Sequence, residues 1–284
     1  MDDTTELIDH HGDRITRLFR VYWGCAGLGA VVLGVLSWVL LPAGLVVGLV
    51  VAVGLMALAG WLLHRSEGWL IAACGGSVVD DEQQPRLAGI VESLCFTSGV
   101  AMPDLRVVES SSRNLVAVGR VPERSVLIVT SGLLESVDRV ELEALVASEI
   151  AQIRTLDVAY VTVAATTVGL PALLADLGGR KRRGAPGPLS ALGSWCAVGL
   201  LPLARLSARR LRRELEPDRD FRTDLAGVRL TRYPPGMISA LERLDGNGDG
   251  LDVAAATSPL WVVDPGHAEL RPSVAIRIAA LREL

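Results

Sequence analysis

A run of 43 residues without a charged side chain, from Val21 to Leu63, constrains this chain more than any other feature. As a helix this run would be about 65 Å long, which is two crossings of a hydrocarbon core of roughly 30 Å. The sequence LLPAG at 40–44 supplies a break, so we predict membrane spans near 21–41 and 44–63. A cleaved signal peptide would be shorter and would end in a small-residue cleavage site, so that interpretation is rejected.

The charges that flank this run predict its orientation. Arg14, Arg17 and Arg20 precede the first span, Arg65 follows the second, and the short loop between the spans has no charge. Because positive charge stays on the cytoplasmic side, both ends of the hairpin are expected in the cytoplasm. We therefore expect a multi-pass protein of the cytoplasmic membrane of a bacterium, with its globular domain facing the cytoplasm.

Two weaker apolar runs occur later, at 158–175 and 184–204, with the basic sequence RKRR at 180–183 between them. If both runs crossed the membrane, this cluster would lie outside, against the positive-inside rule. Two crossings and a shallow re-entrant pair are both open interpretations. The chain then divides into a cytoplasmic segment at 1–20, a transmembrane hairpin at 21–63, the first part of a globular domain at 64–157, the two hydrophobic segments at 158–204, and the second part of the domain at 205–284.

Composition narrows the classes of partner. The net charge is −4 and no aromatic residues alternate with the arginines, so nucleic-acid binding is not expected. The basic stretch Arg205–Arg213 is expected to contact membrane lipid. The four cysteines have no CxxC spacing, which argues against a zinc ribbon or a disulfide framework. No small-molecule cofactor is predicted.

The soluble segments predict an α+β domain that is mainly helical, with one small sheet. Strand candidates lie at 105–109, 115–119 and 125–130, each rich in β-branched residues. Asp138 and Glu141 form the sequence pattern of a capping box at the start of the next helix. On that helix Glu149 shares a stripe with apolar residues, so its carboxyl group is expected to be buried, which is costly without a partner. Hydrogen bonds from Ser148, Gln152 or a neighbouring arginine are the expected partners.

The order of these segments resembles the HtpX-like and CAAX-prenyl-protease-like family of membrane zinc metallopeptidases. The sequence RNLVAVGRVPERSVLIVTSGLLESVDRVELEALVASEIAQIRTLD at 113–157 looks like the family's edge strand, capped helix and HExxH helix. DRDFRTDLAGVRLTRYPPGMISALERL at 218–244 is similar to the helix with the third zinc ligand, and PLWVVDP and RPSVAIRIAALREL are similar to the C-terminal signature. The resemblance implies a zincin-like metallopeptidase domain behind the transmembrane hairpin.

The departures from this family pattern fall on the chemistry. The resemblance puts Ser148 and Gln152 at the two histidine positions of HExxH, Asp220 at the third ligand, and Arg271 at a further histidine. Asp224 and Arg277 match the family and are expected to hold helices together. A catalytic zinc site usually needs three protein ligands. Without zinc, the pKa of water stays near 15.7 instead of about 7, which forfeits roughly 12 kcal/mol toward hydroxide formation. We therefore expect no metal ligand set and no catalytic residue.

Two binding hypotheses remain open. The resemblance implies that the family's edge strand takes extended substrate, so Asn114, Leu115, Val116, Ala117 and Gly119 are candidate peptide-binding residues. This mode of binding uses backbone groups and needs no zinc. DGNGDGLD at 245–252 begins like a calcium-binding loop, but position twelve is Ala256 instead of glutamate, which favours a solvated linker.

The sequence therefore predicts a pseudoprotease that is not an enzyme. Its expected role is a scaffold, adaptor or regulatory subunit that binds other membrane proteins or a protease partner. One alternative is an active membrane zinc endopeptidase with an unconventional or partner-completed site. The other is a purely structural subunit of a membrane complex.

Overall fold

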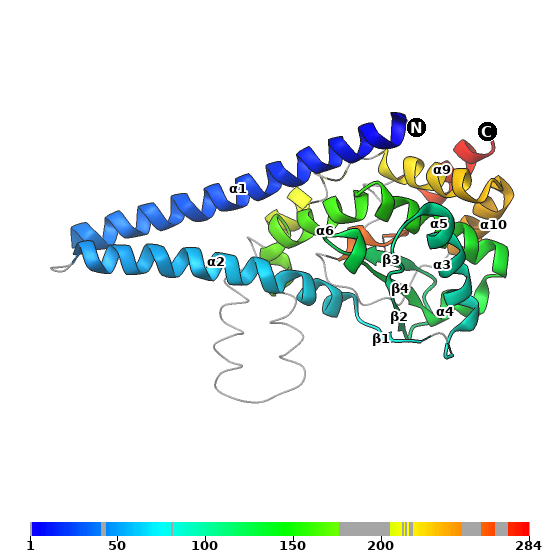
Figure 1. Cartoon of the computed structure of the whole chain (residues 1–284), viewed down its shortest axis with the longest axis horizontal. Helices are drawn as coiled ribbons and strands as arrows, with labels where there is room; N and C mark the ends of the chain where they lie inside the picture. Colours follow the sequence, from blue (N-terminus) through cyan, green and yellow to red (C-terminus); the bar gives the residue numbers. More distant parts are fainter. Residues whose placement is uncertain are drawn as a thin grey trace.

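The computed structural model describes residues 2–40, 44–80, 82–175, 205–211, 213, 215, 218–245, 257–264 and 272–283. Two long helices, α1 (Asp2–Leu40) and α2 (Gly44–Cys74), extend to one side of a globular domain (Figure 1). The domain contains the strands β1 (Ser77–Val78), β2 (Asp104–Val108), β3 (Leu115–Val118) and β4 (Val126–Thr130). Its helices include α3 (Pro85–Ser98), α4 (Ser131–Ser136), α5 (Arg139–Arg154), α6 (Asp157–Thr167), α9 (Arg219–Thr231), α10 (Pro234–Leu244) and α11 (Val274–Leu281).

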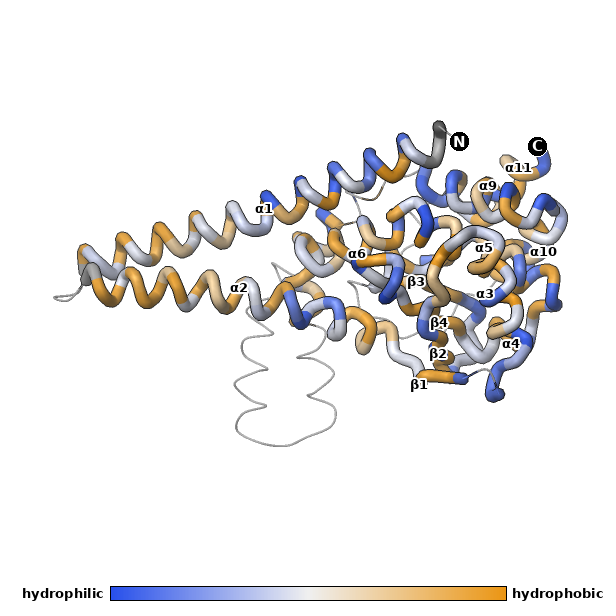
Figure 2. The backbone as a smooth tube through the Cα atoms, in the orientation of Figure 1, coloured by the Kyte–Doolittle hydropathy of each residue, from blue (hydrophilic) through white to orange (hydrophobic). Residues whose placement is uncertain are grey.

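The hairpin of α1 and α2 confirms the prediction of two N-terminal apolar helices. Both helices are long and apolar enough to cross a membrane. Large apolar side chains, such as Val39 and Leu28, are more than half exposed on its surface, as expected for lipid contact. Hydrophobic residues dominate the end of the hairpin that is distant from the domain, whereas the first turns of α1 are hydrophilic (Figure 2). Helix α1 is therefore one continuous rod with an aqueous part and a membrane part.

Small residues allow the two helices to pack closely at one level of the hairpin. A Cβ atom added to Gly48 would lie only 2.5 Å from the carbonyl oxygen of Gly34, so the two backbones approach each other there. At Gly60 a Cβ would meet only the side chain of Trp23, and at Gly54 it would meet nothing within 4 Å. The two helices therefore approach each other most closely at Gly48 and its partner Gly34.

The sheet has the strand order β1-β2-β4-β3, with β2 and β4 parallel and the other pairs antiparallel. The three predicted strands are confirmed within one residue at each end, and the two-residue strand β1 was not predicted. Alternate side chains of the sheet face two cores. Those of Leu115, Ala117, Leu127 and Val129 pack with α3, α5 and α10, and those of Val116, Val118, Val126 and Ile128 pack with α6 and the end of α2. Strand β4 is therefore buried along its whole length, because both of its faces are covered.

Helix α5 lies at the centre of the domain and begins as the sequence predicts. The Asp138 side chain accepts a hydrogen bond from the Glu141 amide at 2.8 Å, and the Glu141 side chain accepts one from the Asp138 amide at 2.9 Å. This capping box satisfies two amides that the helix itself cannot pair. Eleven of the sixteen residues of α5 are buried, which places its third turn inside the protein.

Helix α6 begins the first of the two later apolar runs. Its described residues are buried within the domain, packed against α1, α2 and β3. The Arg14 guanidinium of α1 lies 4.2 Å from the centroid of the Tyr160 ring, so a cation–π contact joins α1 to α6. Residues 176–204, which carry the rest of the predicted hydrophobic pair and the RKRR cluster, lie outside the described residues, as does most of the 245–252 segment.

Candidate functional site

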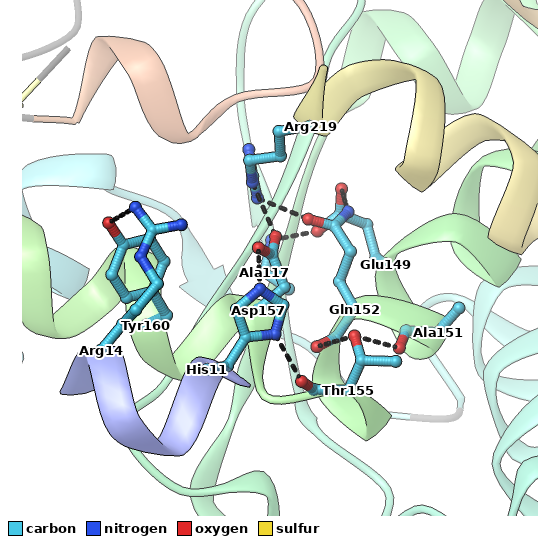
Figure 3. A network of polar contacts seen from close by, with 10 residues as sticks. All are labelled: His11, Arg14, Ala117, Glu149, Ala151, Gln152, Thr155, Asp157, Tyr160 and Arg219. Atoms are coloured by element: carbon cyan, nitrogen blue, oxygen red, sulfur yellow. Dashed lines mark hydrogen bonds and ion pairs between the residues drawn. The ribbon is translucent and has the colours of Figure 1, made fainter. Parts of the chain in front are cut away.

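Glu149 confirms the expectation of a buried carboxyl group, since it is only 3% exposed. Its Oε2 accepts a hydrogen bond from the amide of Ala117 on β3 at 2.8 Å, and its Oε1 accepts one from the Gln152 amide group at 3.1 Å (Figure 3). Burial raises the pKa of Glu149 to about 7, although Arg219 and the Ala117 amide favour the charged form. The group is therefore poised to exchange a proton near neutral pH.

Ser148 and Gln152, the residues at the two histidine positions of the resemblance, are both occupied within the chain. The Ser148 hydroxyl donates to the carbonyl oxygen of Leu145 at 2.7 Å and does not bond to Glu149. The Gln152 side chain donates to Glu149 and accepts a hydrogen bond from Arg219 on α9. Of the alternative partners expected for Glu149, the structure shows Gln152, whereas the Ser148 hydroxyl bonds to the carbonyl of the preceding turn, as a serine in a helix can.

Arg219 connects α9 to the end of α5. Its Nε donates to Asp157 Oδ2 at 2.6 Å, and its Nη2 donates to Gln152 (Figure 3). Burial works against the charge of the guanidinium, but the carboxylates of Asp157, Asp220 and Glu149 outweigh it and raise the pKa of Arg219. A positive charge is thus fixed beside the Glu149 helix. Arg219 was not among the predicted site residues, although it lies next to one of them.

Asp220 is buried and borders a small hollow between Val262–Asp264, Pro272–Val274 and Arg277. One turn further along α9, Asp224 and Arg277 form a buried bidentate ion pair with distances of 2.7 and 2.6 Å. The same guanidinium donates to the Val262 carbonyl at 2.9 Å. This geometry agrees with the prediction that Asp224 and Arg277 hold helices together. Arg271 lies outside the described residues.

The candidate peptide-binding residues form the edge strand β3 and its flanks, and the chain itself pairs their outward groups. The Leu115 carbonyl accepts from Val262 at 3.1 Å, the Ala117 amide donates to Glu149, and the Gly119 amide donates to the Thr162 hydroxyl at 3.0 Å. The Asn114 side chain accepts a hydrogen bond from the Val263 amide and donates one to the Val263 carbonyl. A peptide that added to this edge would therefore have to displace the Trp261–Val263 segment first.

The described residues do not fit a catalytic zinc ion. The resemblance assigns the Ser148 hydroxyl and the neutral Gln152 amide to the positions of two imidazoles, and both groups are engaged within the chain. The Arg219 guanidinium brings a positive charge to the same place, which disfavours a second cation. Within the part of the chain that the structure describes, no three His, Cys, Asp or Glu side chains form a group that could hold a metal ion.

Together, the hairpin, the mixed sheet and the buried glutamate helix define a membrane-anchored α+β domain of metallopeptidase type. The sequence profile of peptidase family M48 matches residues 81–284, and the chain belongs to this family. This result confirms the recognised family and the fold class. No solved structure shows a significant match.

Several similar proteins are named "Protease HtpX homolog". One from Streptococcus agalactiae serotype III is 30% identical over 276 residues, which cover 91% of this chain and 90% of the relative. One from Dictyoglomus thermophilum is 35% identical over 71% of this chain and 70% of the relative. One from Dictyoglomus turgidum is 35% identical over 65% of this chain and 62% of the relative.

These relatives overturn one expectation from the sequence. The chain was expected not to be an enzyme, but its family and its named relatives point to a protease. The expectation rested on the missing histidines, which concern only the ligands that α5 offers. With the two apolar helices, the relatives also support a location in the bacterial inner membrane.

Proposed function

We propose that this chain is a component of a proteolytic system in the bacterial inner membrane and that a partner chain completes its hydrolytic site. In this assembly the chain acts as an adaptor that binds segments of membrane proteins. The family and the named relatives support the proteolytic activity. The flanking arginines Arg14, Arg17, Arg20 and Arg65 support a domain on the cytoplasmic side, where such segments become accessible.

The observation that carries the proposal is the engagement of Ser148 and Gln152 within the chain. A protease whose own helix does not offer two imidazoles needs groups from elsewhere to activate water. Glu149 is suited to take part in such a shared site, because its pKa of about 7 allows it to accept and release a proton at neutral pH. Displacement of the Trp261–Val263 segment would free the edge of β3, whose Ala117 amide contacts Glu149.

The test compares the isolated chain with the chain in its native membranes. Purified wild-type protein in detergent, supplied with zinc, is expected not to cleave an unfolded membrane-protein substrate. Native membranes that contain the chain are expected to cleave it, and membranes from a deletion strain are not. Complementation with Glu149→Gln is expected to fail, whereas the exposed control Glu92→Gln on α3 restores cleavage.

Three results would overturn the proposal. Zinc-dependent cleavage by the purified chain alone would show that no partner is needed. Unchanged cleavage in the deletion strain would remove the chain from the reaction. Full cleavage with Glu149→Gln would show that α5 contributes nothing to the site.

A further inference from the structure

His11 lies on the aqueous part of α1, far from the site in the sequence, yet it is only 3% exposed. Its Nδ1 is 2.8 Å from the carbonyl oxygen of Thr155, and its Nε2 is 3.5 Å from Oδ1 of Asp157. Its ring stacks on Tyr160, with centroids 5.9 Å apart and an interplanar angle of 16°. Both nitrogens of one imidazole thus face acceptors at the junction of α5 and α6 (Figure 3).

The Asp157 carboxylate is shared between two elements that are distant in sequence. Its Oδ1 faces His11 of α1, and its Oδ2 accepts the 2.6 Å hydrogen bond from Arg219 of α9. Arg219 in turn donates to Gln152, which donates to Glu149. A chain of polar contacts therefore runs from the membrane anchor to the buried glutamate through four side chains, His11, Asp157, Arg219 and Gln152.

The length of α1 connects this chain of contacts to the first membrane span. Helix α1 continues from Asp2 to Leu40, so His11 and the apolar turns that begin at Val21 belong to one rod. His11 lies ten residues before Val21, or about 15 Å along the axis. A rotation or tilt of the first membrane helix would therefore move His11 relative to Asp157.

We propose that His11 is a positioning residue that couples the first membrane helix to the Arg219–Gln152–Glu149 contacts by fixing the Asp157 carboxylate. When α1 is docked, Asp157 holds Arg219, and Arg219 holds Gln152 against Glu149. When α1 moves away, Asp157 loses one of its two restraints. The inference rests on the proposed function only for its consequence in proteolysis, since the coupling itself is a property of the folded chain.

The test is hydrogen exchange of the full-length protein in lipid nanodiscs. His11→Ala is expected to raise exchange about tenfold at the start of α6 and also at the start of α9, which is the size expected when the buried Asp157 carboxyl group loses a polar partner. His10→Ala is the matched control, because His10 is the exposed neighbour on the same helix. It is expected to leave both segments unchanged.

Two conservative variants separate coupling from simple docking. The amide of Gln can occupy the position of Nε2 and reach Asp157, whereas the shorter Asn can occupy only the position of Nδ1 and reach Thr155. His11→Gln is expected to retain protection at α9, and His11→Asn is expected to lose it. These variants also keep the test valid if His11→Ala does not fold.

Exchange that rises at α6 alone, or equal rescue by Gln and Asn, would overturn the coupling. Identical exchange in His11→Ala and His10→Ala would also overturn it. Because no cleavage is measured, a failure of the proposed proteolytic role would leave these readouts unaffected.

Discussion

Helix α9 contributes Arg219 and Asp224, five residues apart, to two ion pairs that differ in how completely their charges are matched. Asp224 and Arg277 share two short hydrogen bonds, and both side chains are at most 3% exposed. Arg219 instead divides its donors between Asp157 and Gln152 and lies near the carboxyl groups of Asp220 and Glu149. In the Asp224–Arg277 pair, one positive charge matches one negative charge in a fixed bidentate geometry. Around Arg219, three carboxyl groups share a single positive charge.

Burial is the main cause of the raised pKa of Glu149. A buried carboxyl group remains charged only where hydrogen bonds and positive charge offset the loss of water. Arg219 favours the charged form of Glu149, but burial outweighs this effect, and the nearby Asp157 carboxylate also raises the pKa. Glu149, beside Arg219, is thus expected to exchange its proton near neutral pH, whereas the Asp224–Arg277 pair stabilises the fold.

The largest effect is expected from breaking the Asp224–Arg277 pair. Asp224→Asn leaves the Arg277 charge buried and unmatched, which should lower the free energy of unfolding by about 3–5 kcal/mol. Denaturant unfolding in detergent measures this change. The control is Arg282→Ala, which removes an exposed pair with Glu242 and should cost less than about 1 kcal/mol. Equal losses in both variants would mean that the Asp224–Arg277 pair does not hold the domain together.

A smaller and pH-dependent effect is expected at Glu149. Its pKa is raised from 4.5 to about 7, so the folded state binds its proton more tightly than the unfolded state does. Stability from this group is therefore complete below pH 4.5 and falls as the pH rises to about 7, by about 3 kcal/mol. The difference in melting temperature between wild type and Glu149→Gln, measured from pH 5 to pH 8, should shrink or change in favour of the variant as the pH rises. The exposed Glu92→Gln should show no such trend, and a parallel pair of curves for Glu149→Gln would contradict the assigned shift.

The smallest effect is expected from Arg219→Lys. This substitution keeps the positive charge but replaces the planar guanidinium, which has several donors, with a single ammonium group. Lysine cannot reproduce the geometry that serves both Asp157 and Gln152, so we expect a loss of about 1.5–3 kcal/mol in the free energy of unfolding. Arg229→Lys, at an exposed position of the same helix, should change little. If the two variants are equally stable, Arg219 does not organise the site through its two contacts.

Local features of the sequence predicted much of the fold. The uncharged run indicated the hairpin, the β-branched segments indicated three strands, and Asp138 with Glu141 indicated the start of α5. Burial of Glu149 also followed from helical spacing. These features depend on neighbours within a few residues, which sequence periodicity reports directly.

The site contacts depend on residues that are distant in sequence, and periodicity does not report them. His11 meets Thr155 across 144 positions, and Arg219 meets Asp157 across 62. Asn114 was considered a candidate for peptide binding, but its amide holds Val263 of the chain itself. A neighbouring arginine was among the expected partners of the buried carboxylate, since a buried carboxylate needs a donor, but sequence spacing did not identify it as Arg219.

The metal content of the purified, untagged protein tests the central claim most directly. Elemental mass spectrometry should find far less than one zinc per chain in the wild type. The variant that combines Ser148→His, Gln152→His and Asp220→Glu should gain zinc, because it supplies two imidazoles and a carboxylate. Near-stoichiometric zinc in the wild type, lost on Asp220→Ala, would contradict the claim and would show that the chain holds its own metal ion.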